Sequence, residues 1–179
     1  GLAWTSVGGT LLEAEVNVVP GSGKVELTGN LGNVMKESAQ TALSYVRSAA
    51  DQYGVKNSYF EKHDIHIHIP EGAVPKDGPS AGITMAAAMM SAVTNRLVSA
   101  KTAMTGEVTL RGRVLPIGGL KEKLLAARMA HIEKVLVPAK NRPDVEELSR
   151  EITKGMEIVF VTSMEEVLRE ALLGTAEKK

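Results

Sequence analysis

Residues 75–82 have the sequence PKDGPSAG, and an uncharged run that begins at Gly78 continues for 18 residues to Asn95. Three prolines and two glycines within residues 70–79 predict a loop. The alanine-rich run after them predicts a buried helix over residues 80–95. The run is near the lower length limit of a membrane span, but its polar ends and many alanines favour a helix inside a soluble domain, with no membrane partner.

Hydrophobic periodicity predicts a mixture of strands and helices on both sides of this segment. Before it we expect a strand (12–18), a Pro-Gly-Ser-Gly turn (20–23), a returning hairpin strand (24–28), an amphipathic helix ended by Gly54 (34–53) and a strand (64–69). After it we expect short strands (101–105 and 113–115), a helix (119–131), a strand (134–137), a helix (144–150), a strand (157–161) and a helix capped by Ser163 and Glu166. This irregular order favours an α+β fold, with mixed sheets and hairpins packed against several helices.

The composition is that of an ordinary globular protein. The chain has 179 residues, 44% of them hydrophobic, which suits a single domain over residues 1–173 and a disordered tail over 174–179. Lys plus Arg and Asp plus Glu number 21 each, so the net charge is zero and no nucleic-acid site is evident. The absence of cysteine excludes disulfides, thiolate zinc sites and a cysteine nucleophile, and it favours a cytoplasmic protein.

Ser80 is the first candidate for chemistry, because it lies where the proline-rich loop meets the predicted helix. Unpaired backbone N–H groups and the positive end of a helix dipole at such a position stabilise a developing oxyanion. Serine is also a favoured N-cap residue, so a purely structural role stays open. Residues 78–82 also fit GxSxG, but the intervening loop and the single later histidine, His131, disfavour a nucleophile elbow.

A lysine can act as the base for such a serine when burial keeps its amine neutral. On the helical wheel of residues 119–131, Lys123 lies between two alanines, whereas Lys121 lies beside Arg128. The pattern therefore predicts that Lys123 is buried and Lys121 is solvated. A lysine at the rim of an apolar stripe can also extend its amine to water, and this alternative stays open for Lys123.

Three segments together resemble the proteolytic domain of bacterial Lon protease, an ATP-dependent serine peptidase. They are PKDGPSAG (75–82), MTGEVTLRGRVLPIGGLKEKLLAA (104–127) and VLVPAKNRPDVEEL (135–148). The resemblance covers nearly the whole chain. It implies a Ser–Lys dyad formed by Ser80 and Lys123, with Thr105 orienting the lysine.

The resemblance also implies that Asp77 and the preceding loop residues Val74, Pro75 and Lys76 border the substrate groove. It implies unfolded or regulatory proteins as substrates, a quality-control role and a homo-oligomer in the form of a six-membered ring. Full Lon proteins carry an ATPase module, and no GxxxxGK[ST] occurs here, so we expect ATP and Mg only for that absent module. Because the chain opens with Gly-Leu-Ala-Trp rather than Met, we expect it to be an excised domain.

Two other kinds of site have partial support in the sequence. His66 and His68 project from one face of the predicted strand, but hydrogen bonding at a half-buried surface is the commoner role of such histidines, so we expect no metal. A glycine-rich loop at a helix N-terminus can also bind phosphate. A non-catalytic anion-binding module is therefore the alternative function, and it would keep Lys123 charged.

Overall fold

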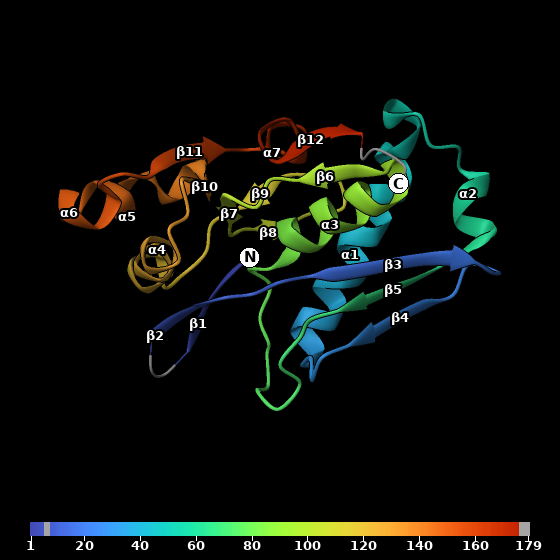
Figure 1. Cartoon of the computed structure of the whole chain (residues 1–179), viewed down its shortest axis with the longest axis horizontal. Coiled ribbons are helices and arrows are strands. Elements are labelled where there is room, and N and C mark those ends of the chain that lie inside the picture. Colours follow the sequence, from blue (N-terminus) through green and yellow to red (C-terminus); the bar gives the residue numbers. More distant parts are fainter. Residues whose placement is uncertain (6–7, 176–179) are drawn as a thin grey trace.

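Helix α3 (Gly82–Thr94) is buried on nearly every side and forms the centre of the fold. The structure is a computed structural model that describes residues 1–5 and 8–175. A helix that is apolar all round has to be covered by other elements. The elements that contact α3 include α1 (Asn33–Ala49), β3 (Glu15–Pro20), β6 (Arg96–Val98) and α7 (Met164–Ala171), and Figure 1 shows it among them. The buried helix predicted over residues 80–95 is confirmed.

The amphipathic helix predicted over residues 34–53 is also confirmed, as α1 followed by the 3₁₀ turn η1 (Ala50–Tyr53). Its apolar face, which includes Met35, Ala42 and Val46, packs against α3. Gly54 ends the helix in the left-handed conformation, with φ of 82°, which glycine adopts without steric cost. A short helix, α2 (Ser58–Glu61), then leads to the next strand.

The first sheet has the strand order β3-β5-β4, in which β5 (His63–His68) lies between β3 and β4 (Val25–Thr28). Because β5 runs antiparallel to β3 and parallel to β4, the predicted hairpin of residues 12–28 is wrong. Asp64 of β5 binds the turn between β3 and β4. Its Oδ1 accepts hydrogen bonds from the backbone N–H groups of Ser22, Gly23 and Lys24 at 2.9, 3.1 and 2.8 Å. These bonds tie the turn to β5, which fills the space between the two strands.

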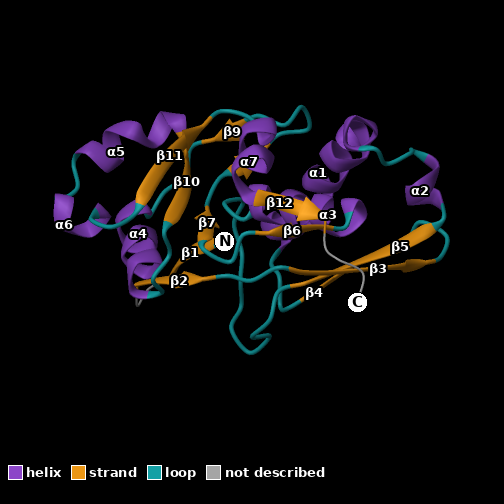
Figure 2. Ribbon diagram, turned by 45° about the horizontal axis from the view of Figure 1, so that its top comes forward, coloured by secondary structure: helices purple, strands orange, loops and turns teal. Residues whose placement is uncertain are grey.

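The second sheet is parallel, with the order β11-β10-β7. Its strands are β7 (Thr102–Met104), β10 (Lys134–Pro138) and β11 (Glu157–Val161). The central strand β10 carries three fully buried residues, Val135, Leu136 and Val137. Val135 and Val137 pack in a hydrophobic cluster with residues of α4 (Leu120–Met129), separately from the larger cluster around α3. Figure 2 shows this sheet beside α4 and away from the β3-β5-β4 sheet.

The remaining elements are short. Three further strand pairs are β1 (Leu2–Thr5) with β2 (Gly8–Leu11), β6 with β12 (Leu172–Thr175), and β8 (Glu107–Val108) with β9 (Val114–Leu115). The turn η2 (Ala139–Asn141) and the helices α5 (Arg142–Glu146) and α6 (Arg150–Thr153) follow β10. Helix α7 is capped as predicted, because the Ser163 hydroxyl accepts a hydrogen bond from the backbone N–H of Glu166.

Two boundary predictions need correction. The helix predicted over residues 144–150 is two short helices, because Ser149 caps a new helix with its side chain instead of continuing the first one. The predicted tail begins too early, since Gly174 and Thr175 belong to β12; residues 176–179 lie outside the described residues.

The mixed sheets and helices confirm the predicted α+β class. The single-domain assignment of residues 1–173 stays a prediction. Within residues 1–5 and 8–175, no helix is both long enough and apolar enough to cross a membrane.

Replacing Ile67 with alanine is expected to lower the free energy of unfolding by about 2–5 kcal/mol, because this β5 side chain is fully buried. The control is Val19→Ala in the adjacent strand, where the side chain is 43% exposed. The control should change the free energy by no more than about 0.5 kcal/mol. Urea unfolding measures the free energy of unfolding of both variants. Equal losses of free energy would contradict the assignment of Ile67 to the buried face of the sheet.

Candidate active site

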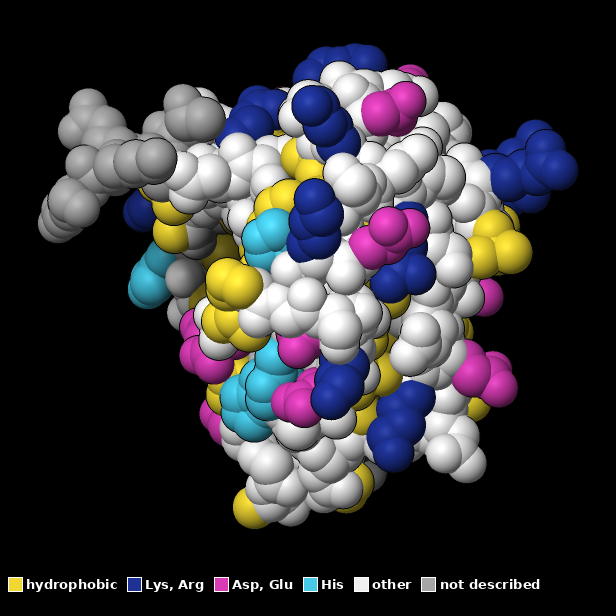
Figure 3. Space-filling model, turned by 90° about the vertical axis from the view of Figure 1, so that its right-hand side faces the viewer, with side chains coloured by type: hydrophobic (Ala, Val, Ile, Leu, Met, Phe, Trp, Pro, Cys, Tyr) yellow, Lys and Arg dark blue, Asp and Glu magenta, His cyan; other side chains and the backbone are white. Residues whose placement is uncertain are grey.

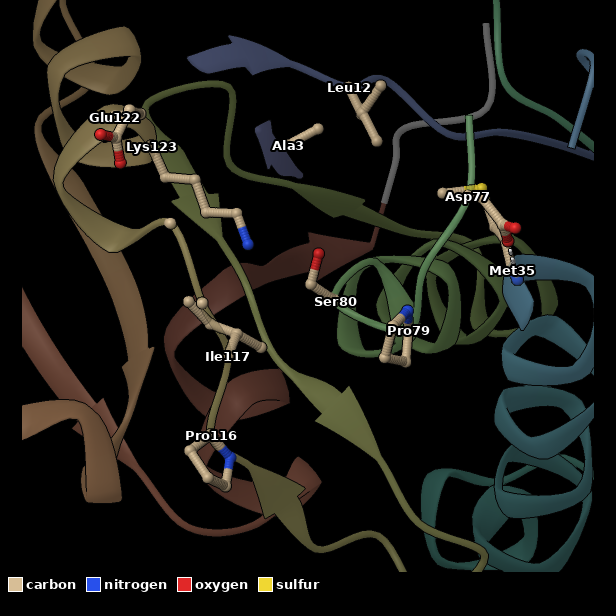
Figure 4. A pocket seen from close by; sticks show the side chains of 12 residues that line it. Ala3, Leu12, Met35, Asp77, Pro79, Ser80, Pro116, Ile117, Glu122 and Lys123 are labelled. Atoms are coloured by element: carbon tan, nitrogen blue, oxygen red, sulfur yellow. Dashed lines mark hydrogen bonds between the residues drawn. The ribbon is translucent and has the colours of Figure 1, made fainter. Parts of the chain in front are cut away.

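A cavity of about 600 Å³ lies where the loop before α3 meets the start of α4. It brings together Ser80, Lys123 and Asp77, three of the residues singled out from the sequence. The other lining residues come from the N-terminal segments (Ala3 and Leu12), α1 (Met35), the loop before α3 (Pro79), the loop before α4 (Pro116, Ile117, Gly118 and Gly119) and α4 itself (Glu122). Figure 4 shows Ser80 and Lys123 on opposite walls of this cavity.

Ser80 lies two residues before the first residue of α3 and is half-buried. The N-cap position belongs to Ala81, and the helix has no side-chain cap, so Ser80 does not have the capping role that the sequence left open. Its backbone carbonyl accepts a hydrogen bond from the N–H of Gly106 at 2.8 Å, which fixes the residue against β7 and β8. Its hydroxyl has no hydrogen-bond partner among the described residues, and Figure 4 shows it directed into the cavity.

Lys123 lies in the first turn of α4, on the face that packs against the second hydrophobic cluster. Its side chain is only 3% exposed, whereas Lys121 is exposed, as the helical wheel predicts. The amine Nζ donates a hydrogen bond to the hydroxyl of Thr105, at 3.3 Å. Thr105 is fully buried directly after β7, and its backbone N–H donates to the carbonyl of Leu136. The parallel sheet thus fixes the position of Thr105, the hydrogen-bond partner of Lys123.

Burial lowers the pKa of Lys123 from 10.5 to about 8, because the charged form loses its hydration. No carboxylate in the described part of the chain forms an ion pair with this amine to oppose the shift. At pH 7, about a tenth of the population would therefore carry a neutral amine.

Figure 4 shows the amine of Lys123 directed toward the hydroxyl of Ser80 across the cavity. The two groups do not make a hydrogen bond in this structure. Catalytic hydrogen bonds are often longer before substrate binds and shorten in the complex. The arrangement is therefore that of a potential nucleophile facing a base that burial has made partly neutral.

The backbone around Ser80 also offers hydrogen-bond donors. The N–H groups of Gly82 and Ile83 already donate to the carbonyls of Pro79 and Gly106. The N–H groups of Ser80 and Ala81 have no partner within the described residues, and they precede the positive end of a 13-residue helix. These two groups are suited to bind a negatively charged oxygen next to the Ser80 hydroxyl.

Asp77 lines the cavity but points away from Ser80, toward α1 (Figure 4). Its Oδ1 accepts hydrogen bonds from the backbone N–H groups of Met35 and Gly78, at 2.9 and 2.8 Å, and these bonds lower the pKa of the carboxyl group. A Cβ atom at Gly32 would lie 2.3 Å from the Asp77 carboxyl carbon, so only glycine allows this approach. Asp77 thus supplies the cap that α1 lacks and ties the Ser80 loop to that helix.

The other predicted groove residues, Val74, Pro75 and Lys76, are not among the residues that line this cavity. Val74 is exposed. Lys76 is buried, and its Nζ donates to the carbonyls of Gly29, Glu71 and Val74 at 2.8, 2.7 and 2.9 Å. The Lys76 side chain therefore holds the loop in shape, and contact of this loop with substrate stays a prediction.

The sequence did not indicate that residues 116–119 form a wall of the cavity across from Ser80, or that Ala3, Leu12 and Met35 line it. Proline followed by paired glycines before a helix was the one available signal for that wall.

The histidines lie elsewhere: the Thr28 hydroxyl is hydrogen-bonded to both His66 and His68, at 2.7 and 2.6 Å, on the outer face of the first sheet. Figure 3 shows histidine side chains on the molecular surface.

Comparison with known proteins shows which family of proteins has this sequence and fold. The sequence profile of the Lon protease (S16) C-terminal proteolytic domain matches residues 1–174. The chain belongs to this family of proteolytic domains.

Among similar proteins, the Lon protease of Lachnoclostridium phytofermentans is 67% identical over 173 residues, which are 97% of this chain and 21% of that protein. Lon protease 1 of Bacillus subtilis is 55% identical over 179 residues, which are 100% of this chain and 23% of that protein. Lon protease 1 of Thermus thermophilus is 58% identical over 169 residues, which are 94% of this chain and 21% of that protein. The chain thus spans about a fifth of the length of these relatives.

The pKa of Lys123 can be measured by NMR titration of lysine side chains carrying ¹³C and ¹⁵N. We expect one lysine to titrate near pH 8 and to be missing from the spectrum of Lys123→Met. Because the folded protein binds this proton more weakly than the unfolded chain does, the group should add stability as the pH rises above about 8. The assignment fails if no lysine titrates below about pH 9.

Proposed function

We propose that the chain is a serine endopeptidase domain in which Ser80 is the nucleophile and Lys123 is the general base. One observation carries the proposal: in one cavity, a buried lysine amine is directed at a serine hydroxyl, and within residues 1–5 and 8–175 neither the amine has an acidic partner nor the hydroxyl a hydrogen-bond partner. Membership of a family of proteolytic domains supports the same chemistry. Burial supplies what a serine nucleophile needs, which is a neutral base at near-neutral pH.

The reaction starts with the neutral amine of Lys123. It takes the proton of the Ser80 hydroxyl as Oγ attacks the carbonyl carbon of the peptide bond, and the carbonyl oxygen becomes an oxyanion. The N–H groups of Ser80 and Ala81 donate hydrogen bonds to this oxygen. As the C–N bond breaks, the leaving amine takes the proton from Lys123, and an ester of Ser80 remains. Water then attacks the ester carbon while the same lysine takes a proton from it. As the bond from this carbon to Ser80 Oγ breaks, Lys123 returns the proton to Oγ, and the acid product leaves.

Thr105 orients the base. Its hydroxyl accepts a hydrogen bond from the Lys123 amine, and its own position is fixed by burial after β7. A neutral amine has one lone pair, which must point at the serine proton if the transfer is to be efficient. The bond to Thr105 uses an N–H of the amine and leaves that lone pair free to face the cavity.

The properties of the whole protein are also part of the proposal. The similar proteins are named Lon proteases, and they are several times longer than this chain. We propose that this domain works within an ATP-dependent quality-control protease of the cytoplasm, that it assembles into a six-membered ring and that it cleaves unfolded or regulatory proteins. ATP and Mg would act in another module of that protein.

The alternative, an anion-binding module, needs a charged lysine at the same place. The variant Lys123→Arg separates the two functions, because arginine keeps the positive charge but cannot become a neutral base. Loss of peptide hydrolysis in this variant supports the peptidase. A wild-type protein that is stabilised by phosphate and never labelled at Ser80 by a fluorophosphonate would instead support the anion-binding module.

Replacing Ser80 with alanine should reduce peptide hydrolysis by at least about a thousandfold, because the nucleophile is removed. Folding should be unaffected, since the Ser80 side chain neither caps α3 nor bonds to another described residue. Ser44→Ala, at an exposed position of α1, is the matched control and should keep full activity. Hydrolysis that persists in a correctly folded, pure Ser80→Ala protein would rule out this nucleophile.

Lys123→Ala should be similarly inactive, whereas Lys121→Ala should keep most of its activity. The two lysines lie in the same turn of α4, but Lys121 is exposed and Lys123 faces the cavity. Steady-state hydrolysis of a fluorogenic peptide, with thermal unfolding to match the variants for stability, makes the comparison. Equal losses of activity would show that the position of Lys123 has no special role.

A further inference from the structure

Beside Lys123, the wall of the cavity opposite Ser80 is formed by one stretch of chain, residues 116–119. Three of its residues, Ile117, Gly118 and Gly119, also line a second cavity, of about 460 Å³, on the other side. The wall therefore has a cavity on each face, and two adjacent glycines give its backbone little conformational restraint of its own. Figure 4 shows Ile117 on this wall, on the side of the cavity across from Ser80.

One buried side chain fixes this wall. Asn141, in the turn η2 after β10, is only 3% exposed. Its Oδ1 accepts a hydrogen bond from the backbone N–H of Ile117 at 2.9 Å, and its Nδ2 donates to the Ile117 carbonyl at 2.8 Å. The second hydrogen of Nδ2 goes to Oδ2 of Asp144, also at 2.8 Å. Both N–H donors of the amide are thus used, and Asn141 pairs with Ile117 as a neighbouring strand would.

We propose that Asn141 is a positioning residue that fixes residues 116–119 and thereby sets where the substrate chain lies relative to Ser80. The inference rests on the proposed peptidase function, which it extends to the substrate-facing wall. Asn141 acts through Ile117 and has no contact with the proposed catalytic groups. Lys123 is held independently, by the packing of α4 and by Thr105. Loss of Asn141 should therefore impair substrate binding more than the reactivity of Ser80.

The chemistry of the site requires an amide. An aspartate at position 141 could still accept from the Ile117 N–H, but its other oxygen would face the Ile117 carbonyl or the Asp144 carboxylate, which are both acceptors. A leucine of similar size would leave the N–H and the carbonyl of Ile117 without their partner. Both substitutions keep the approximate volume of the side chain and remove its hydrogen-bond pattern.

The test compares wild type, Asn141→Asp, Asn141→Leu and the control Asp144→Asn, which keeps an acceptor for Nδ2 of Asn141. For the two Asn141 variants we expect KM for a fluorogenic peptide to rise by about tenfold or more, as the loss of a buried hydrogen-bond partner predicts. The rate of Ser80 labelling by a small dialkyl fluorophosphonate should stay within about twofold of wild type. Hydrogen exchange of the Ile117 amide should become faster in both variants, and Asp144→Asn should resemble wild type in all three measurements.

The double variant Asn141→Asp/Asp144→Asn adds a rescue. Its aspartate can accept a hydrogen bond from the new amide at position 144, so we expect KM to recover in part. The inference is overturned if KM and Ile117 exchange are unchanged in folded Asn141 variants, or if labelling falls as far as peptide hydrolysis. A wild-type protein that neither hydrolyses peptide nor labels at Ser80 would overturn the proposed function itself. In that case the exchange of Ile117 would still report whether Asn141 fixes the wall.

Discussion

The amine of Lys123 is buried with no acid among the described residues to pair with it, and the arrangement around the cavity depends on this one constraint. A charged ammonium in such a place is costly, so the protein shifts the group toward its neutral form. Three parts of the fold maintain the burial. The hydrophobic cluster packs on one face of α4, the parallel sheet supplies Thr105, and the β1–β2 pair covers the first turn of the helix. That cover is close, since a Cβ atom at Gly9 would lie 2.1 Å from the carbonyl oxygen of Glu122.

The loop that carries Ser80 forms another wall of the cavity, and hydrogen bonds hold it in place. Lys76 binds three carbonyls within and beside this loop, and Asp77 joins it to the N-terminus of α1. The carbonyl of Ser80 is bound by Gly106, one residue after Thr105. Ser80 and Lys123 are thus hydrogen-bonded to two adjacent residues, Gly106 and Thr105. Residues 105–106 therefore fix the relative positions of Ser80 and Lys123, which lie about 40 residues apart in the sequence.

Local patterns predicted the elements whose form depends on near neighbours. The helix ended by Gly54, the strand with alternating isoleucines, the cap at Ser163 and the burial of Lys123 all follow from spacing within one or two turns. Strand pairing was not predictable in this way, because the insertion of β5 between β3 and β4 depends on Asp64, some 40 residues after the turn that it binds. The orientation of Asp77 toward α1 and the wall held by Asn141 are long-range contacts of the same kind. The pairing of Ser80 with Lys123 came from family resemblance, and the structure adds the shared cavity and the cause of the lowered pKa.

The pH dependence of Ser80 reactivity tests the central claim most directly. The second-order rate constant for labelling of Ser80 by a fluorophosphonate would be measured from pH 6 to pH 10, in a protein shown to stay folded over that range. The account predicts that the rate rises with pH, with an apparent midpoint near the Lys123 pKa of about 8, and that this rise is lost in Lys123→Arg. A rate that is constant from pH 6 to pH 9 in the wild-type protein, or a rise that persists in the arginine variant, would contradict it.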